Sequence, residues 1–161
     1  MPATVADLDD VGNHLFVRAR DAMLACGEQA DVRALPPPQR IERVLNAWFD
    51  ALAPHRLAAR DILLYRLQPP HLHHQAALVV ALSRTVQWLR EAAGLVGAGR
   101  RRSREETSLT VLFVTVLPMW LADSSPGQQR TKQSLARRLS SLGRRLGWER
   151  RVRPPGQLND R

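Results

Sequence analysis

Apolar side chains recur at spacings of three and four residues along most of this chain, and prolines and glycines interrupt the pattern at intervals. This spacing gathers apolar residues on one face of an α-helix, whereas a half-buried strand would alternate apolar and polar residues. We expect six helices, at about residues 7–26, 39–52, 55–67, 71–93, 104–123 and 128–146. No strand pattern is evident, so the predicted fold class is all-α, a helical bundle of about six helices.

Particular residues set the expected ends of these helices. Gly27 ends the first helix, and residues 28–35 form a linker to the proline run at 36–38. Ser103 and Glu106 have the spacing of a capping box, so the fifth helix begins after Ser103 and the preceding residues form a loop. Pro118 is expected to kink that helix.

The length of 161 residues suits a single domain. Residues 1–147 contain the periodic segments, and residues 148–161 are predicted to form a basic, disordered tail. The formal net charge is +9, and residues 130–161 carry ten basic side chains against two acidic ones. Such a segment can contact nucleic acid or an anionic membrane surface, or it can be a solvated helix face followed by a disordered end.

The cellular compartment follows from cysteine content and from the ends of the chain. The single cysteine, Cys26, excludes an internal disulfide and a cysteine-based zinc site, and it fits a reducing compartment. Acidic residues near the start do not suit an export signal. The longest apolar run, residues 109–122, is shorter than the roughly 20 residues that span a bilayer. We therefore expect a cytoplasmic protein.

The sequence offers little catalytic or metal chemistry. His71, His73 and His74 lie close together, but no nearby carboxylate completes a typical metal site, and solvated imidazoles at a helix start explain the cluster. No serine or cysteine lies in a nucleophile elbow. The glycine-rich stretch at 94–102 lacks the Lys-Ser/Thr of a phosphate-binding loop. We predict no enzyme activity, no metal and no cofactor, which leaves binding and pairing.

Four segments together indicate a known family. They are "AWFDALAPHR" (47–56), "LSRTVQWLREAAG" (82–94), "SLTVLFVTVLPMWLADSSP" (108–126) and "LARRLSSLGRRL" (135–146). In this order they resemble the C-terminal ligand-binding and dimerisation domain of TetR-type transcriptional regulators, particularly the subgroup related to the lipid-binding ubiquinone-biosynthesis accessory protein. The resemblance covers about residues 7–146.

The resemblance implies two sets of functional residues. In the family, the last two helices pair with their copies in a second subunit. The residues that fall on these pairing helices are Leu109, Leu112, Val116, Trp120, Leu135, Leu139 and Leu142. The middle helices of the family enclose an apolar ligand cavity, and the corresponding residues are Trp48, Phe49, Leu52, Leu64, Val79, Leu82, Val86 and Phe113. Spacing alone does not distinguish a lined cavity from a packed core.

One departure from the family pattern affects the expected function. The family begins with a helix-turn-helix module that reads DNA, and no room for it precedes Asp7. Either the start codon is assigned too far downstream, or the chain is a family member that has lost direct DNA reading. We expect a ligand-sensing, homodimerising regulatory domain with a small apolar or amphipathic effector and no sequence-specific DNA binding of its own. The alternatives are a stand-alone lipid- or isoprenoid-binding accessory protein, with its basic C-terminal segment on a membrane, and a bundle that only pairs.

Overall fold

The computed structural model describes residues 5–66 and 72–148, with the side chains of residues 13–64 and 79–148. Within these ranges the chain is all-α, as the sequence predicted, with no strand. The helices are α1 (Val5–Glu28), α2 (Ala30–Ala34), α3 (Pro37–Leu52), α4 (Arg56–Arg66), α5 (Leu72–Ala92), α6 (Gly99–Ala122) and α7 (Gln129–Leu146), with 3₁₀ turns at Ala53–His55 and Pro126–Gln128.

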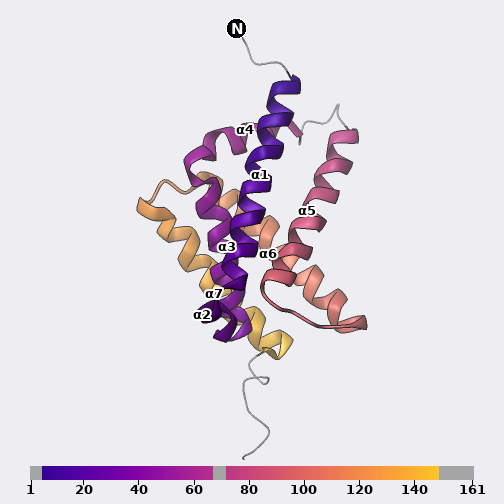
Figure 1. The fold of residues 1–161 in the computed structure, drawn as a ribbon, viewed down its shortest axis with the longest axis vertical. Helices are drawn as coiled ribbons and strands as arrows, with labels where there is room; N and C mark the ends of the chain where they lie inside the picture. The colour runs from indigo at the N-terminus through magenta and orange to yellow at the C-terminus, as the bar shows by residue number, and fades with distance from the viewer. Residues whose placement is uncertain (1–4, 67–71, 149–161) are drawn as a thin grey trace, which may run out of the picture.

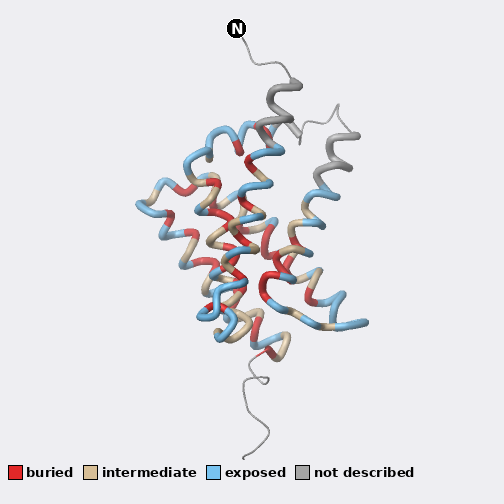
Figure 2. Tube along the Cα trace, viewed as in Figure 1, coloured by how far each residue is buried: buried red, intermediate tan, exposed pale blue. Residues whose placement is uncertain are grey.

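The helices surround one core. α3 packs against both α1 and α7, α6 packs against α5 and α7, and α1 also contacts α5 and α4 (Figure 1). Figure 2 shows the buried residues on the inner sides of these helices, with the described first half of α5 exposed. The core thus lies between α1, α3, α5, α6 and α7.

Aromatic side chains fill the centre of that core. Trp48 and Phe49 of α3 meet Phe113 and Trp120 of α6, with ring centroids 5.1 to 6.3 Å apart. Phe16 of α1 stacks on Trp48 from the other side, at 6.2 Å. These distances are those of directly touching rings, and aromatic pairs of this kind stabilise a fold by about 0.5–1.5 kcal/mol beyond their buried area. The cluster joins α1, α3 and α6.

Two expectations about the first helix are corrected. α1 does not end at Gly27, and the predicted linker contains the short helix α2, whose Val32 is buried. Gly27 instead lies where α1 crosses α5, and a Cβ atom there would be 2.4 Å from the carbonyl oxygen of Ala92. The glycine is therefore required by close packing, a constraint that a single sequence does not display.

The start of α6 is also earlier than predicted. The helix begins at Gly99, its N-cap is Ala98, and no side-chain cap is present, so Ser103 lies inside the helix and the capping box does not form. The preceding loop is correspondingly short. This shift moves Arg100, Arg101 and Arg102 from the expected loop onto the first turn of α6.

Asp123 organises the turn between α6 and α7. Its carboxylate accepts hydrogen bonds from the backbone and hydroxyl groups of Ser125 and of Thr131, at 2.6 to 2.9 Å. Burial on its own would raise the pKa of Asp123, but these four donors outweigh it and hold the pKa well below its usual range. Arg56 also donates to the backbone carbonyl of Asp123. The turn thereby fixes α7 against α6.

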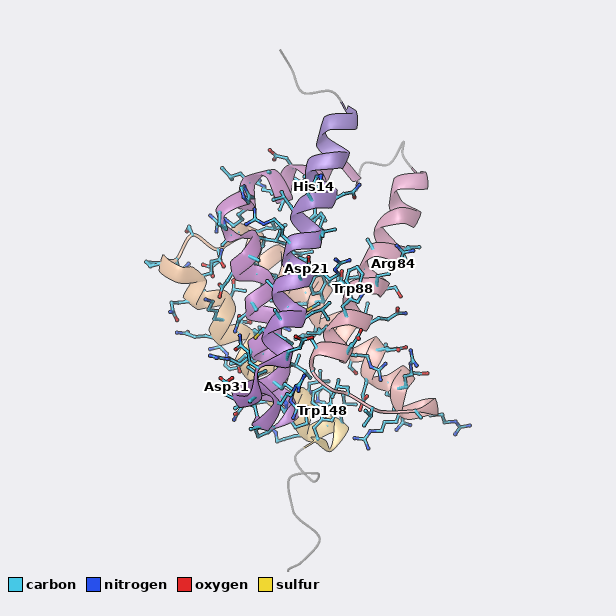
Figure 3. All side chains as sticks on the ribbon, viewed as in Figure 1. His14, Asp21, Asp31, Arg84, Trp88 and Trp148 are labelled. Atoms are coloured by element: carbon cyan, nitrogen blue, oxygen red, sulfur yellow. The ribbon has the colours of Figure 1, made fainter. Side chains whose placement is uncertain are left out.

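The folded region continues past the predicted domain end at residue 147. Trp148, assigned to the disordered tail on sequence, is fully buried and packs near Gly143 (Figure 3). Its indole nitrogen donates to Glu105 Oε1 at 3.2 Å. The ordered domain thus includes Trp148, whereas the remainder of the predicted tail, 149–161, lies outside the described residues.

Candidate pairing and effector-binding surfaces

The residues predicted to pair two subunits lie inside the protomer. Leu109, Leu112, Val116 and Trp120 form the inner face of α6, and each is at most 6% exposed. Leu135 and Leu139 on α7 are equally buried, and Leu142 is half-buried against the same core. Both helices were predicted, although α6 begins earlier than expected, and these seven side chains face the protomer's own core.

The opposite face of α6 is apolar and exposed. Val111 and Val114 are 61% and 49% exposed, and Pro118 continues this row at helical spacing. Thr110 and Thr115 flank this row of residues. The hydroxyl of Thr110 donates to the backbone carbonyl of Glu106, and that of Thr115 donates to the backbone carbonyl of Val111. Because these hydroxyls bond within the helix, they leave methyl groups to the surroundings. We call Val111, Val114 and Pro118 the outer stripe of α6.

α6 is longer than the apolar run that the sequence analysis judged too short for a membrane. By length and composition alone it could cross one, although a core helix of a soluble protein passes the same test. Leu109, Phe113 and Trp120 are held in the protomer core. Nevertheless, only 33% of its most apolar stretch is buried. The helix thus carries more apolar surface than the protomer covers.

The residues predicted to line a ligand cavity separate into two groups. Trp48, Phe49, Leu52, Val86 and Phe113 are buried, and the three aromatic rings touch one another. Leu82 is half-buried, whereas Leu64 and Val79 are 51% and 65% exposed. The structure therefore brings the aromatic residues together as packed core and leaves Leu64 and Val79 on the surface. Sequence periodicity could not separate these outcomes, since it reports faces and not contacts.

The first half of α5 presents apolar residues that the body of the protomer does not cover. Val79 and Val80 are both at least half exposed, whereas Val86 and Leu89, further along the helix, are buried. Trp88 is oriented toward α1, where the Arg20 guanidinium lies 5.3 Å from the centre of its ring (Figure 3). The second half of α5 is therefore anchored, and its described first half is much less so.

Two surface cavities lie elsewhere, among polar residues. The first, of about 340 Å³, lies between the end of α3 and the α6–α7 turn, where Lys132 pairs with Asp50 at 3.0 Å. The second, of about 410 Å³, lies between the start of α6 and the end of α7 and is lined mainly by arginines. No residue of the predicted ligand set lines either cavity.

The histidine cluster cannot be placed on this structure. His71 lies outside the described residues, as do the side chains of His73 and His74. Among the described side chains, no group of three or more His, Cys, Asp or Glu residues could hold a metal ion. Cys26 is half-buried, and burial, opposed in part by Arg43, raises the pKa of its thiol.

Two surface features of the structure were not selected from sequence. The uninterrupted apolar run of α6 concealed which side of the helix faces outward, so Val111 and Val114 were not selected. Their spacing from Pro118 was the available signal, but Leu109, Leu112 and Val116 share the same period. The arginine-lined cavity was missed because Arg100 and Arg101 were assigned to a loop and because Arg145 is distant from them in sequence.

Comparisons with known proteins identify the family. No protein-family model matches the chain, and no curated protein does. Among solved structures, the chain is similar to the crystal structure of the TetR transcriptional regulator from Nitrosomonas europaea ATCC 19718, with 34% sequence identity and a TM-score of 0.71. The similarity covers 83% of this chain and 71% of that chain, and it relates the chain to a regulator instead of an enzyme. The chain belongs to the TetR family of transcriptional regulators.

Proposed function

We propose that this chain acts as the homodimerising, effector-responsive part of a TetR-like regulator and that two copies pair through the outer stripe of α6. The observation that carries the proposal is the exposure of Val111 and Val114 on a helix whose opposite face is core. Contiguous exposed apolar surface usually marks an interface. α7 lies beside α6, so a two-fold axis near the outer stripe would gather four helices.

Light scattering on purified protein tests the pairing. The wild type should have about twice the protomer mass of 18.1 kDa, and Val111→Glu with Val114→Glu should reduce it to one protomer because two carboxylates would be desolvated in the interface. Val96→Glu is the matched control, since Val96 is 83% exposed in the α5–α6 loop. A wild-type monomer, or a doubly substituted chain that stays dimeric, would refute the pairing surface.

The effector part of the proposal rests on α5. Its described first half exposes Val79 and Val80, and Leu82 is only half-buried. An apolar or amphipathic molecule inserted beneath this half would cover these side chains and fasten the helix to the body. The aromatic residues of α3 and α6 already pack against one another. The effector site is therefore proposed beneath α5, where the ligand itself would supply the missing contacts.

Thermal melting against a panel of fatty acids, quinones and aromatic compounds tests effector binding. A ligand at a hundred times its dissociation constant stabilises the fold by about 2.7 kcal/mol. Val79→Ser with Val80→Ser should weaken the response, whereas Val96→Ser should leave it unchanged. Flat melting curves across the whole panel would remove the effector from the proposal while leaving pairing in place.

The packed aromatic cluster favours a second candidate, a TetR-like domain that only pairs. Trp48 and Phe113 are in ring contact at 5.1 Å, and Phe49 and Trp120 at 5.3 Å. A core of this density needs no ligand to be stable. Both candidates predict a dimer. Only the first predicts that a compound of the panel stabilises the protein in the melting experiment.

We also propose that the 161-residue chain does not recognise an operator sequence by itself. In the described region, arginines gather at the start of α6 and along α7, and both helices are packed into the protomer core, which leaves neither free to enter a major groove. DNA binding by this chain should be insensitive to sequence and should weaken steeply with salt. Discrimination between operator and random duplexes at physiological salt would contradict this.

A further inference from the structure

The end of the molecule where α6 begins and α7 ends contains a cavity lined by arginines. Arg100, Arg101 and Arg104 come from the first two turns of α6, and Arg145 comes from the last turn of α7. The cavity measures about 410 Å³, within the range of about 300–1,000 Å³ that small-molecule sites occupy. We call it the arginine cleft.

The positive charge of the arginine cleft is only partly balanced. Arg101 pairs with Glu105 at 3.1 Å. Within the part of the chain that the structure describes, Arg100, Arg104 and Arg145 make no ion pair and no side-chain hydrogen bond. Three guanidinium groups therefore line one concave site without a partner among the described residues.

The backbone adds to this charge. α6 begins without a side-chain cap and without an acidic residue in its first turn, although negative groups are favoured at that end of a helix. Its first turn carries arginines instead, next to the free N–H groups. An anion in the cleft would relieve repulsion that the described residues compensate only in part.

The floor of the cleft contains a buried carboxylate, Glu105. Glu105 is 1% exposed, and its carboxylate is held by Trp148 at 3.2 Å and by buried Arg90 at 3.5 Å. Its Oε2 atom has no hydrogen-bond donor. Arg90 approaches Glu105 from the core and Arg101 pairs with it from the cleft, so this carboxylate offsets neither Arg100, Arg104 nor Arg145 by a direct ion pair.

We propose that the arginine cleft binds a compact anion carrying two or more phosphate groups, at a site separate from the pairing stripe and from α5. Guanidinium groups recognise phosphate through paired, charge-assisted hydrogen bonds. Their convergence from two helices onto one cavity suits an anion of several charges in a small volume.

Calorimetric titration of the full chain with inorganic tripolyphosphate tests the site. The wild type should bind, and Arg104→Gln with Arg145→Gln should weaken binding roughly tenfold or more, since each hydrogen bond to a charged group contributes substantially. The matched control is Arg130→Gln with Arg137→Gln, which removes the same charge from exposed positions of α7 outside the cleft. The control should stay within about twofold of the wild type, and all variants should melt as the wild type does.

A second arm uses anionic phosphatidylglycerol vesicles, which present phosphate on a membrane surface. Absence of tripolyphosphate binding, or equal loss in the cleft and control variants, overturns the proposal. Vesicle binding that needs Arg104 and Arg145 while tripolyphosphate does not bind would also overturn it and would assign the arginines to a membrane surface.

Discussion

The indole nitrogen of Trp148 donates a hydrogen bond of 3.2 Å to Glu105 Oε1, which joins the end of α7 to the beginning of α6. Both residues are buried, and Arg90 of α5 approaches the same carboxylate at 3.5 Å. Three helices are thus connected through one buried acid. Breaking this group should be costly, because a buried charge that loses its partner keeps its desolvation penalty.

Glu105→Ala is therefore expected to lower the free energy of unfolding by about 3 kcal/mol, because it leaves Arg90 with Glu106 alone. Glu91→Ala, an exposed position on α5, is the control and should change stability by less than about 0.5 kcal/mol. Urea unfolding followed by circular dichroism measures both. A Glu105→Ala cost as small as the control's would show that the buried acid is dispensable.

Leu139→Glu and Val116→Glu distinguish core from interface. Both side chains are at most 1% exposed within the protomer, so a carboxylate there should unfold the chain instead of yielding a folded monomer. Leu139→Ala should cost about 2–5 kcal/mol by opening a cavity. Circular dichroism reports the loss of helix. A folded monomer from either glutamate variant would show instead that Val116 and Leu139 lie in the subunit interface, as the sequence analysis predicted.

The six longer helices were predicted from sequence because helical period and proline breaks are local signals, whereas the short helix α2 was not. Sequence reasoning could not decide which side of α6 is inner, because apolar residues occupy nearly the whole circumference between Leu109 and Leu121. The choice is made by contacts with other helices, in particular the aromatic side chains of α3, which are distant in sequence. Glu105 and Trp148 were missed for the same reason. Glu105 is charged and Trp148 lies at the predicted start of the tail, so neither was expected to be buried, and the hydrogen bond between them accounts for their burial.

Acid should destabilise the protein through Asp123. The pKa of this carboxyl is lowered in the folded state, so its contribution to stability is complete above its ordinary pKa of about 4 and is lost as the pH falls below that value. Asp123→Asn should therefore cost stability at neutral pH and flatten the acid dependence. Unfolding free energies measured at neutral pH and on the acid side of pH 4 give both quantities. An unchanged acid slope in the variant would show that other groups dominate.

Gly27→Ala should destabilise the protein, although alanine is ordinarily the better helix former. A Cβ at this position would lie 2.4 Å from the Ala92 carbonyl oxygen, so α1 and α5 would have to separate. Such overpacking costs about 1–3 kcal/mol. Ala25→Gly, at an exposed position of α1, is the control. It measures the stability that alanine gains over glycine from helix propensity alone, which is about 1 kcal/mol. Stabilisation by Gly27→Ala would mean that the crossing can relax.

Arg40 connects the ends of two helices. Its guanidinium donates to the carbonyl of Ala93 at 3.0 Å, beyond the end of α5, and to the carbonyls of Arg33 and Leu35 around the end of α2. A planar group with five donors reaches all three acceptors, whereas an ammonium group cannot span them in the same way. Carbonyls at helix ends lack intrahelical partners, so this contact satisfies groups that would otherwise be left unpaired.

Arg40→Lys should therefore behave as a disruptive substitution despite keeping the charge. We expect a loss of about 1–3 kcal/mol, because the partly buried bonds to the carbonyls of Ala93 and Leu35 lose their guanidinium donor, and faster amide hydrogen exchange at the end of α5. Arg43→Lys, one turn later, is the control. Arg43 contacts Asp31 at 3.7 Å on the exposed surface, and such pairs contribute about 0–1 kcal/mol. If Arg40→Lys matched Arg43→Lys in both stability and exchange, the guanidinium geometry would have no special role, and α5 would be anchored by Val86, Leu89 and Ala93 alone.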